Sequence, residues 1–122
     1  MLEHVSLLDS FKYAFQGIYF AIKYNRNIRI HFLAAILVII ASLILRVNAF
    51  EMGILGVMIL LVICAEMINT AIEEMVNLLV QEHRKEAKIA KDVSAGMVLL
   101  TAMGSVIVGV LIFVPHVIRL LK

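Results

Sequence analysis

The amino-acid sequence predicts an all-α membrane protein, with an amphipathic N-terminal helix on the membrane surface and three helices that cross the bilayer. Of the 122 residues, 63% are hydrophobic, which is more apolar surface than one small soluble core can hide. Charged residues leave long gaps, and the longest runs from Val93 to Ile118. That gap exceeds the roughly 20 residues that a membrane-spanning helix needs. We therefore expect lipid to cover much of a single domain over residues 1–122.

The N-terminal segment, residues 5–24, has the pattern of a helix that lies on a membrane surface. Its apolar residues recur at helical spacing and its charged residues fall elsewhere, as an amphipathic interfacial helix requires. The apolar residues are Leu7, Leu8, Phe11, Ala14, Phe15, Ile18 and Ile22. Because Glu3, His4 and Asp9 stand where a signal peptide needs a basic region and an apolar stretch, we expect no cleaved leader.

Three apolar segments predict the membrane spans, which we place at about residues 30–46, 52–80 and 93–118. Glu66 interrupts the second apolar run, but helical periodicity continues beyond it. We expect this second helix to leave the bilayer and to end near His83. The charged stretch from Gln81 to Asp92 would then connect the second and third spans.

Basic residues predict the orientation of the chain. Most of them flank the predicted spans on one side, namely Lys12, Lys23, Arg26, Arg29, Arg84, Lys85, Lys88 and Lys91. Arg46, Arg119 and Lys122 fall on the other side. By the positive-inside rule, the N-terminus and the Gln81–Asp92 stretch are cytoplasmic.

Composition also argues against several kinds of function. Tryptophan is absent, the formal net charge is only +2, and no basic helix carries interleaved aromatic residues, so we expect no nucleic-acid binding. The four histidines lack the spacing of a metal cluster. Cys64 is the only cysteine, which excludes an intramolecular disulfide.

A polar stripe on the second span is the feature that points to chemistry. It consists of Glu66, Asn69, Thr70, Glu73 and Asn77. These positions share one face of a helix. Counted from the outer end of the span, Glu66 lies about 21 Å deep, where an ionisable group costs at least about 2.5 kcal/mol and is usually kept for function. Such a carboxylate suits a general base, whereas Glu73, about 10 Å nearer the cytoplasm, suits a hard-cation ligand.

Structural roles compete with these functional ones. Asn69, Thr70 and Asn77 could serve helix packing through interhelical hydrogen bonds. Lys91 could be a positive-inside anchor, and Asp92 could cap the third helix. On spacing alone, these alternatives stay open.

The sequence of the stripe, AEMINTAIE at residues 65–73, closely resembles the signature E-x-x-N-[ST]-A-I-E of the prokaryotic diacylglycerol and undecaprenol kinase family. Two further segments resemble the family at similar spacing, namely RNIRIH at residues 26–31 and AKD at residues 90–92. The resemblance covers nearly the whole chain. It implies a homotrimer of three-span subunits in the bacterial inner membrane, with active sites between subunits at the cytoplasmic interface.

The resemblance also implies a reaction and its residues. ATP and Mg²⁺ would be used to phosphorylate a membrane lipid, and Asn69-Thr70 and the Arg-Ile-His segment favour undecaprenol slightly over diacylglycerol. Glu66 would accept the proton of the lipid hydroxyl, Asn69 would position the reacting groups, and Glu73 would hold Mg²⁺ against the ATP phosphates. The residues implied for nucleotide binding are Glu82, Arg84, Lys91 and Asp92.

Asn25 is the main departure from the family pattern, because the family usually has a glutamate there that shares the metal with the Glu73 equivalent. We therefore take Asn25 as a candidate metal and nucleotide ligand that lacks the expected charge. Its presence keeps open the alternative that the chain is a degenerate member that only binds lipid. A small proton-coupled transporter that titrates Glu66 is a second alternative.

Overall fold

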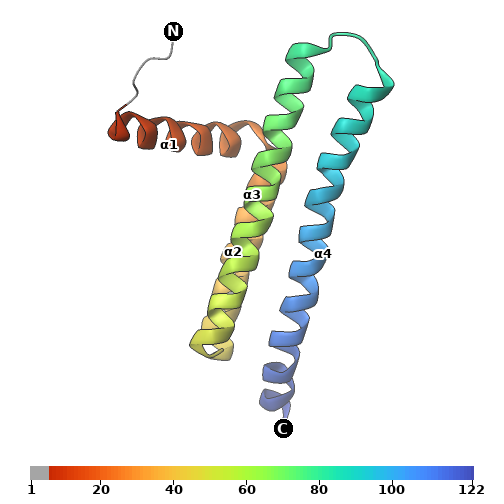
Figure 1. Cartoon of the computed structure of the whole chain (residues 1–122). Helices are drawn as coiled ribbons and strands as arrows, with labels where there is room; N and C mark the ends of the chain where they lie inside the picture. The colour runs from red at the N-terminus through yellow and green to blue at the C-terminus, as the bar shows by residue number, and fades with distance from the viewer. Residues whose placement is uncertain (1–5) are drawn as a thin grey trace.

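The computed structural model describes residues 6–122, which form four helices and, within this range, no strand. The helices are α1 (Leu7–Tyr24), α2 (Arg26–Leu45), α3 (Ala49–Leu79) and α4 (Lys85–Leu121). Helices α3 and α4 run antiparallel side by side, α2 packs along α3, and α1 lies crosswise to the other three (Figure 1). The all-helical prediction is confirmed, and α2, α3 and α4 are long and apolar enough to cross a membrane.

The break between α1 and α2 is a single residue, Asn25, with an extended backbone. Its side-chain Oδ1 accepts hydrogen bonds from the backbone N–H groups of Asn27, at 2.8 Å, and Ile28, at 3.3 Å, as an N-cap residue does. The Arg29 guanidinium donates to the backbone carbonyl oxygens of Lys23, at 2.7 Å, and Ile22, at 3.2 Å. Hydrogen bonds thus satisfy N–H groups at the start of α2 and carbonyl groups at the end of α1, and α1 turns sharply away from α2.

The predicted amphipathic segment is helical from Leu7 to Tyr24. Its expected first residue, Val5, lies outside the described residues, as do Glu3 and His4. Large apolar side chains of α1, such as Phe11 and Phe15, are exposed in the single chain. The position of this helix on a membrane surface stays a prediction.

The turn between α2 and α3 is short, and both of the helix ends that it joins are capped. Arg46 has a left-handed backbone with φ of 54°, a conformation that often ends helices. Asn48 then caps α3: its Oδ1 accepts from the Glu51 N–H at 2.8 Å, and the Glu51 carboxylate accepts from the Asn48 N–H at 3.1 Å. At this end His116 of α4 also contacts Glu51, with Nε2 3.0 Å from Oε1.

The connection between α3 and α4 differs from the sequence prediction. We expected the second helix to end near His83 and a charged connection over residues 81–92, but α3 ends earlier, at Leu79, and α4 begins at Lys85. The suggestion that Asp92 caps the third helix is therefore wrong: the N-cap is Arg84, and Asp92 accepts a hydrogen bond from Lys88 at 2.6 Å within the helix. The reason is local, since residues 85–91 are mostly strong helix formers.

Few side chains are buried within one chain. The buried apolar residues are Ala21, Ile28, Ala35, Leu55, Val62, Ala65 and Ile112. Only 6% of the most apolar 18-residue segment of α4 is buried. The chain is a multi-pass membrane protein whose apolar outer faces need lipid or other protein chains to cover them.

We predict that Asn48→Ala destabilises the protein by about 1 kcal/mol, because it removes the side-chain cap of α3. Asn48→Asp keeps an acceptor oxygen and should stay within a few tenths of a kcal/mol of the wild type. Unfolding of both variants in mixed detergent, followed by circular dichroism, measures the difference. Equal stability of the alanine variant and the wild type would contradict the role of this cap.

Candidate active site

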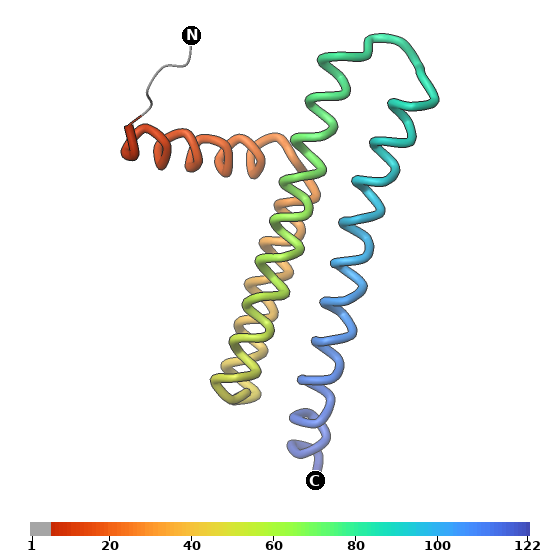
Figure 2. The backbone as a smooth tube through the Cα atoms, viewed as in Figure 1, coloured from red at the N-terminus to blue at the C-terminus, as the bar shows by residue number. Residues whose placement is uncertain are grey.

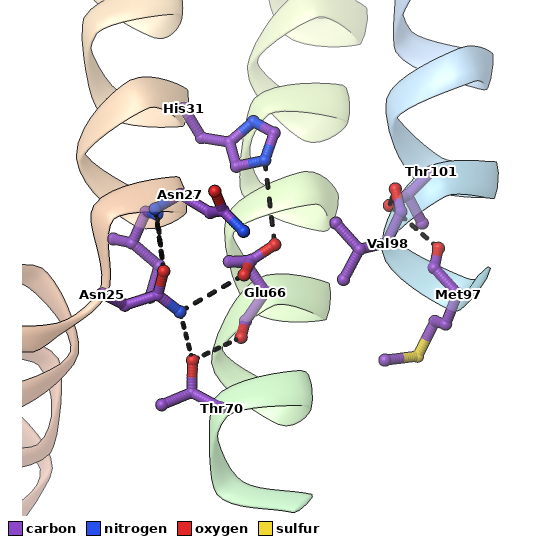
Figure 3. Close-up of polar contacts among 9 residues, drawn as sticks. Asn25, Asn27, His31, Glu66, Thr70, Met97, Val98 and Thr101 are labelled. Atoms are coloured by element: carbon purple, nitrogen blue, oxygen red, sulfur yellow. Dashed lines mark hydrogen bonds and ion pairs between the residues drawn. The ribbon is translucent and has the colours of Figure 1, made fainter. Parts of the chain in front are cut away.

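Glu66 is the centre of a polar cluster between α2 and α3. Its side chain is buried, with 1% of the residue exposed, and each carboxylate oxygen faces a residue of the α1–α2 region (Figure 3). Asn25 donates from Nδ2 to Oε1 at 3.2 Å. His31 places Nε2 3.8 Å from Oε2. Contacts of this kind offset part of the cost of burying a carboxylate among apolar helices.

Thr70 joins the same cluster one helical turn further along α3. Its hydroxyl donates to the backbone carbonyl oxygen of Glu66 at 2.9 Å and accepts from Asn25 Nδ2 at 2.5 Å. The Asn25 amide therefore contacts two side chains of the polar stripe at once (Figure 3). In the described part of the chain, no buried side-chain nitrogen or oxygen lacks a hydrogen-bond partner.

Asn69 connects α3 to α4. Its Oδ1 lies 2.6 Å from the hydroxyl of Ser94, which is also 2.9 Å from the backbone carbonyl oxygen of Lys91. Asn69 and Ser94 are both buried, with exposed fractions of 7% and 3%. This contact holds the start of the apolar part of α4 against the polar stripe.

A hollow of about 220 Å³ opens beside Glu66, and we call it the carboxylate hollow. Its lining comes from the α1–α2 junction and α3, and consists of Phe20, Tyr24, Asn25, Arg26, Asn27, Glu66, Asn69, Thr70, Glu73 and Glu74. Glu73 and Glu74 are exposed, unlike Glu66. Carboxylate oxygens at a water-accessible edge are the ligands that Mg²⁺ prefers.

The described residues hold no group of three or more His, Cys, Asp or Glu side chains that could bind a metal. This does not conflict with Mg²⁺, which usually binds one or two protein carboxylates together with substrate phosphates. Glu73 fits that pattern. Asn25 lines the same hollow, but its amide oxygen is occupied by the cap of α2.

A second hollow of about 610 Å³ lies where α3 ends and α4 begins, and we call it the basic hollow. It is lined by Val76, Asn77, Val80, Gln81, Glu82, His83, Arg84, Lys85, Ala87, Lys88, Lys91 and Asp92. Lys91 donates from Nζ to Asn77 Oδ1 at 2.6 Å, and the exposed Arg84 and Glu82 approach to 3.9 Å. Basic side chains around an open hollow provide donors for phosphate oxygens.

The predicted site residues thus divide between two neighbouring places. Glu66, Asn69, Glu73 and Asn25 line the carboxylate hollow, and Glu82, Arg84, Lys91 and Asp92 line the basic hollow. Asn77 of the basic hollow lies one turn beyond Glu73, about 6 Å along α3, so the hollows follow each other along the polar stripe. His31 and Ser94 were not among the predicted site residues, although the RNIRIH and AKD segments pointed to their neighbourhoods.

A membrane bundle with a buried carboxylate, an exposed carboxylate beside it and a basic hollow one turn away has the parts of a membrane-embedded phosphoryl-transfer enzyme. Comparison with known proteins identifies the family. Residues 12–113 match the sequence profile of the prokaryotic diacylglycerol kinases. The chain belongs to this family, and it is a lipid kinase.

Two curated relatives agree with this assignment. The chain is 41% identical over 117 residues to a protein named diacylglycerol kinase from Synechocystis sp., a match that covers 95% of this chain and 67% of the relative. It is 38% identical over 106 residues to a protein named undecaprenol kinase from Bacillus subtilis, with 87% and 86% covered. Membership in a kinase family decides against the proton-coupled transporter, and it implies a phosphate donor.

Proposed function

We propose that the chain transfers the γ-phosphoryl group of ATP to the hydroxyl of a membrane lipid, with Glu66 as the general base. The observation that carries the proposal is a carboxylate that is 1% exposed yet lines a hollow reached from the α1 end of the bundle. A group in that position can meet the headgroup of a lipid without leaving its buried site. A buried ionisable group among membrane helices is costly and is usually kept for function.

The proposed reaction uses the chain's own residues as follows. Glu66 takes the proton of the lipid hydroxyl while the hydroxyl oxygen bonds to the γ-phosphorus, and the bond from that phosphorus to the bridging β-phosphate oxygen breaks to release ADP. Oε1 already accepts a hydrogen bond from Asn25 at 3.2 Å, so Oε2, which lies 3.8 Å from His31, would take the proton. Asn69, held by Ser94, would align the reacting groups.

Glu73 would hold Mg²⁺ at the water-accessible edge of the carboxylate hollow. When bound there, the ion would neutralise charge on the phosphates during transfer. Arg84 and Lys91 of the basic hollow would bind the nucleotide phosphates, while Glu82 and Asp92 would contact the rest of the nucleotide. The succession of the two hollows along one helix face supports this order.

For the acceptor lipid we propose undecaprenol over diacylglycerol. The preference rests on Asn69-Thr70 and the Arg-Ile-His segment. We also propose that three copies assemble in a bacterial inner membrane with the α1 end facing the cytoplasm. The exposed apolar faces of α2, α3 and α4 leave room for such an assembly.

The substrate proposal predicts that purified protein in detergent, given ATP and Mg²⁺, phosphorylates undecaprenol with a higher kcat/KM than diacylglycerol. Radiolabelled phosphate in the extracted lipid measures both rates. A preference for diacylglycerol would refute the assignment of the acceptor, and phosphorylation of neither lipid would refute the proposed reaction.

Glu66→Gln is expected to lower kcat by about a hundredfold to ten-thousandfold, because the amide keeps the shape of the side chain but cannot accept the proton. Fold and assembly should persist, which size-exclusion chromatography in detergent checks. Turnover at the wild-type rate in a correctly assembled variant would exclude Glu66 as the base.

Glu73→Gln is expected to raise the Mg²⁺ concentration for half-maximal rate by about tenfold or more, since it removes a charged ligand. Excess Mg²⁺ should restore part of the activity. Glu86→Gln is the matched control, because Glu86 is exposed on α4 and lines neither hollow. If both variants show the same Mg²⁺ dependence, Glu73 is not the ligand.

A further inference from the structure

The orientation of the Asn25 amide is determined by the helix that it caps. Its oxygen accepts from two backbone N–H groups, those of Asn27 at 2.8 Å and Ile28 at 3.3 Å. Backbone N–H groups can only donate, so the reversed amide would place N–H against N–H. The oxygen therefore faces the start of α2, and the NH₂ group faces α3.

Both hydrogens of that NH₂ group have acceptors on the polar stripe. One points to Glu66 Oε1 at 3.2 Å and the other to the Thr70 hydroxyl at 2.5 Å. The Thr70 hydroxyl passes its own hydrogen to the backbone carbonyl of Glu66 at 2.9 Å, which leaves it free to accept from Asn25. Each hydrogen donated by Asn25 Nδ2 and by the Thr70 hydroxyl thus has an acceptor, and two of the three contacts end on Glu66 (Figure 3).

We infer that Asn25 is a positioning residue for Glu66 and does not ligate the metal. The inference rests on the proposed role of Glu66 as the base. A metal needs the amide oxygen as its ligand, and that oxygen is committed to the α2 cap. The N–H that Asn25 presents to Oε1 restricts rotation of the carboxylate and keeps Oε2 on the side of His31.

The same contacts explain why a glutamate is not interchangeable with asparagine in this chain. A carboxylate at position 25 offers no hydrogen to Glu66 and would place a second negative charge beside it. Serine and aspartate also cap helices well, but aspartate has no hydrogen to donate, and serine is shorter and lacks the separate NH₂ group that reaches Oε1 while the oxygen caps. Of these residues, only asparagine both caps α2 and donates to Glu66.

A positioning role and a metal-ligand role for Asn25 predict opposite results for Asn25→Asp. Aspartate keeps the cap and adds a hard anionic oxygen. If Asn25 positions Glu66, kcat falls by roughly tenfold to a hundredfold, while the Mg²⁺ concentration for half-maximal rate and the KM for ATP stay unchanged. If Asn25 is a metal ligand, the half-saturating Mg²⁺ concentration falls and kcat is kept or rises, which would overturn the inference.

Two further variants separate positioning from capping. Asn25→Ser retains the cap but cannot reach Glu66, so it should lose kcat as the aspartate variant does, again without a change in Mg²⁺ dependence. Asn48→Asp makes the same exchange at the N-cap of α3, at the opposite end of the bundle, and should leave all three kinetic constants at their wild-type values. Wild-type kcat in both Asn25 variants would overturn the inference.

A stability measurement tests the contact independently of activity. Asn25→Ser, Glu66→Met and the double variant are unfolded in mixed detergent, and the shifts in the unfolding equilibrium constant are compared. In the Glu66→Met background the hydrogen bond to Glu66 is already gone. Asn25→Ser should therefore shift the unfolding equilibrium constant by about tenfold less there than it does in the wild type. If the shifts of the two single variants simply add in the double variant, the contact is refuted. This outcome does not depend on whether the wild type phosphorylates either lipid.

Discussion

The burial of one carboxylate among membrane helices is the constraint on which the other features of the site depend. Glu66 is almost completely enclosed, and such a group persists only where neighbours supply hydrogen bonds. Those neighbours are Asn25 and His31, which lie at the start of α2, and not on α3 itself. Satisfying Glu66 therefore holds α2 against α3, and because Asn25 also ends α1, the same contact sets where the crosswise helix leaves the bundle.

The two hollows differ in chemistry because they differ in access to water. Charges of the basic hollow, such as Arg84 and Lys88, are largely exposed, so their ion pairs contribute little to stability and they remain available for a ligand. Glu66 is not available in this way, because its side chain is already in contact with Asn25 and His31 inside the bundle. The protein thus keeps a buried, fixed carboxylate on α3 and an exposed, adaptable set of cations where α3 ends and α4 begins.

Much of the fold could be predicted from the sequence, because hydrophobic runs and helical periodicity report directly on membrane helices. The polar stripe from Glu66 to Asn77 followed from spacing alone. The start of α4 was placed too late, because charge was taken as a sign of a connection although the segment from Lys85 is rich in helix formers. The direction of the Asn25 amide and the Ser94–Asn69 contact could not be predicted, since each depends on how separate helices pack in three dimensions.

The lengths of α3 and α4 have a consequence for how the two substrates arrive. Their 31 and 37 residues correspond to about 46 Å and 55 Å of helix, against a hydrocarbon layer of about 30 Å. Both helices continue past the level of α1 (Figure 2), which raises the basic hollow above the depth of Glu66. A nucleotide would then enter from the aqueous side and a lipid sideways from its leaflet. Neither route would cross the other, so under the proposed function the two substrates would not compete for one entrance, and the phosphorylated lipid would leave in the plane of the membrane.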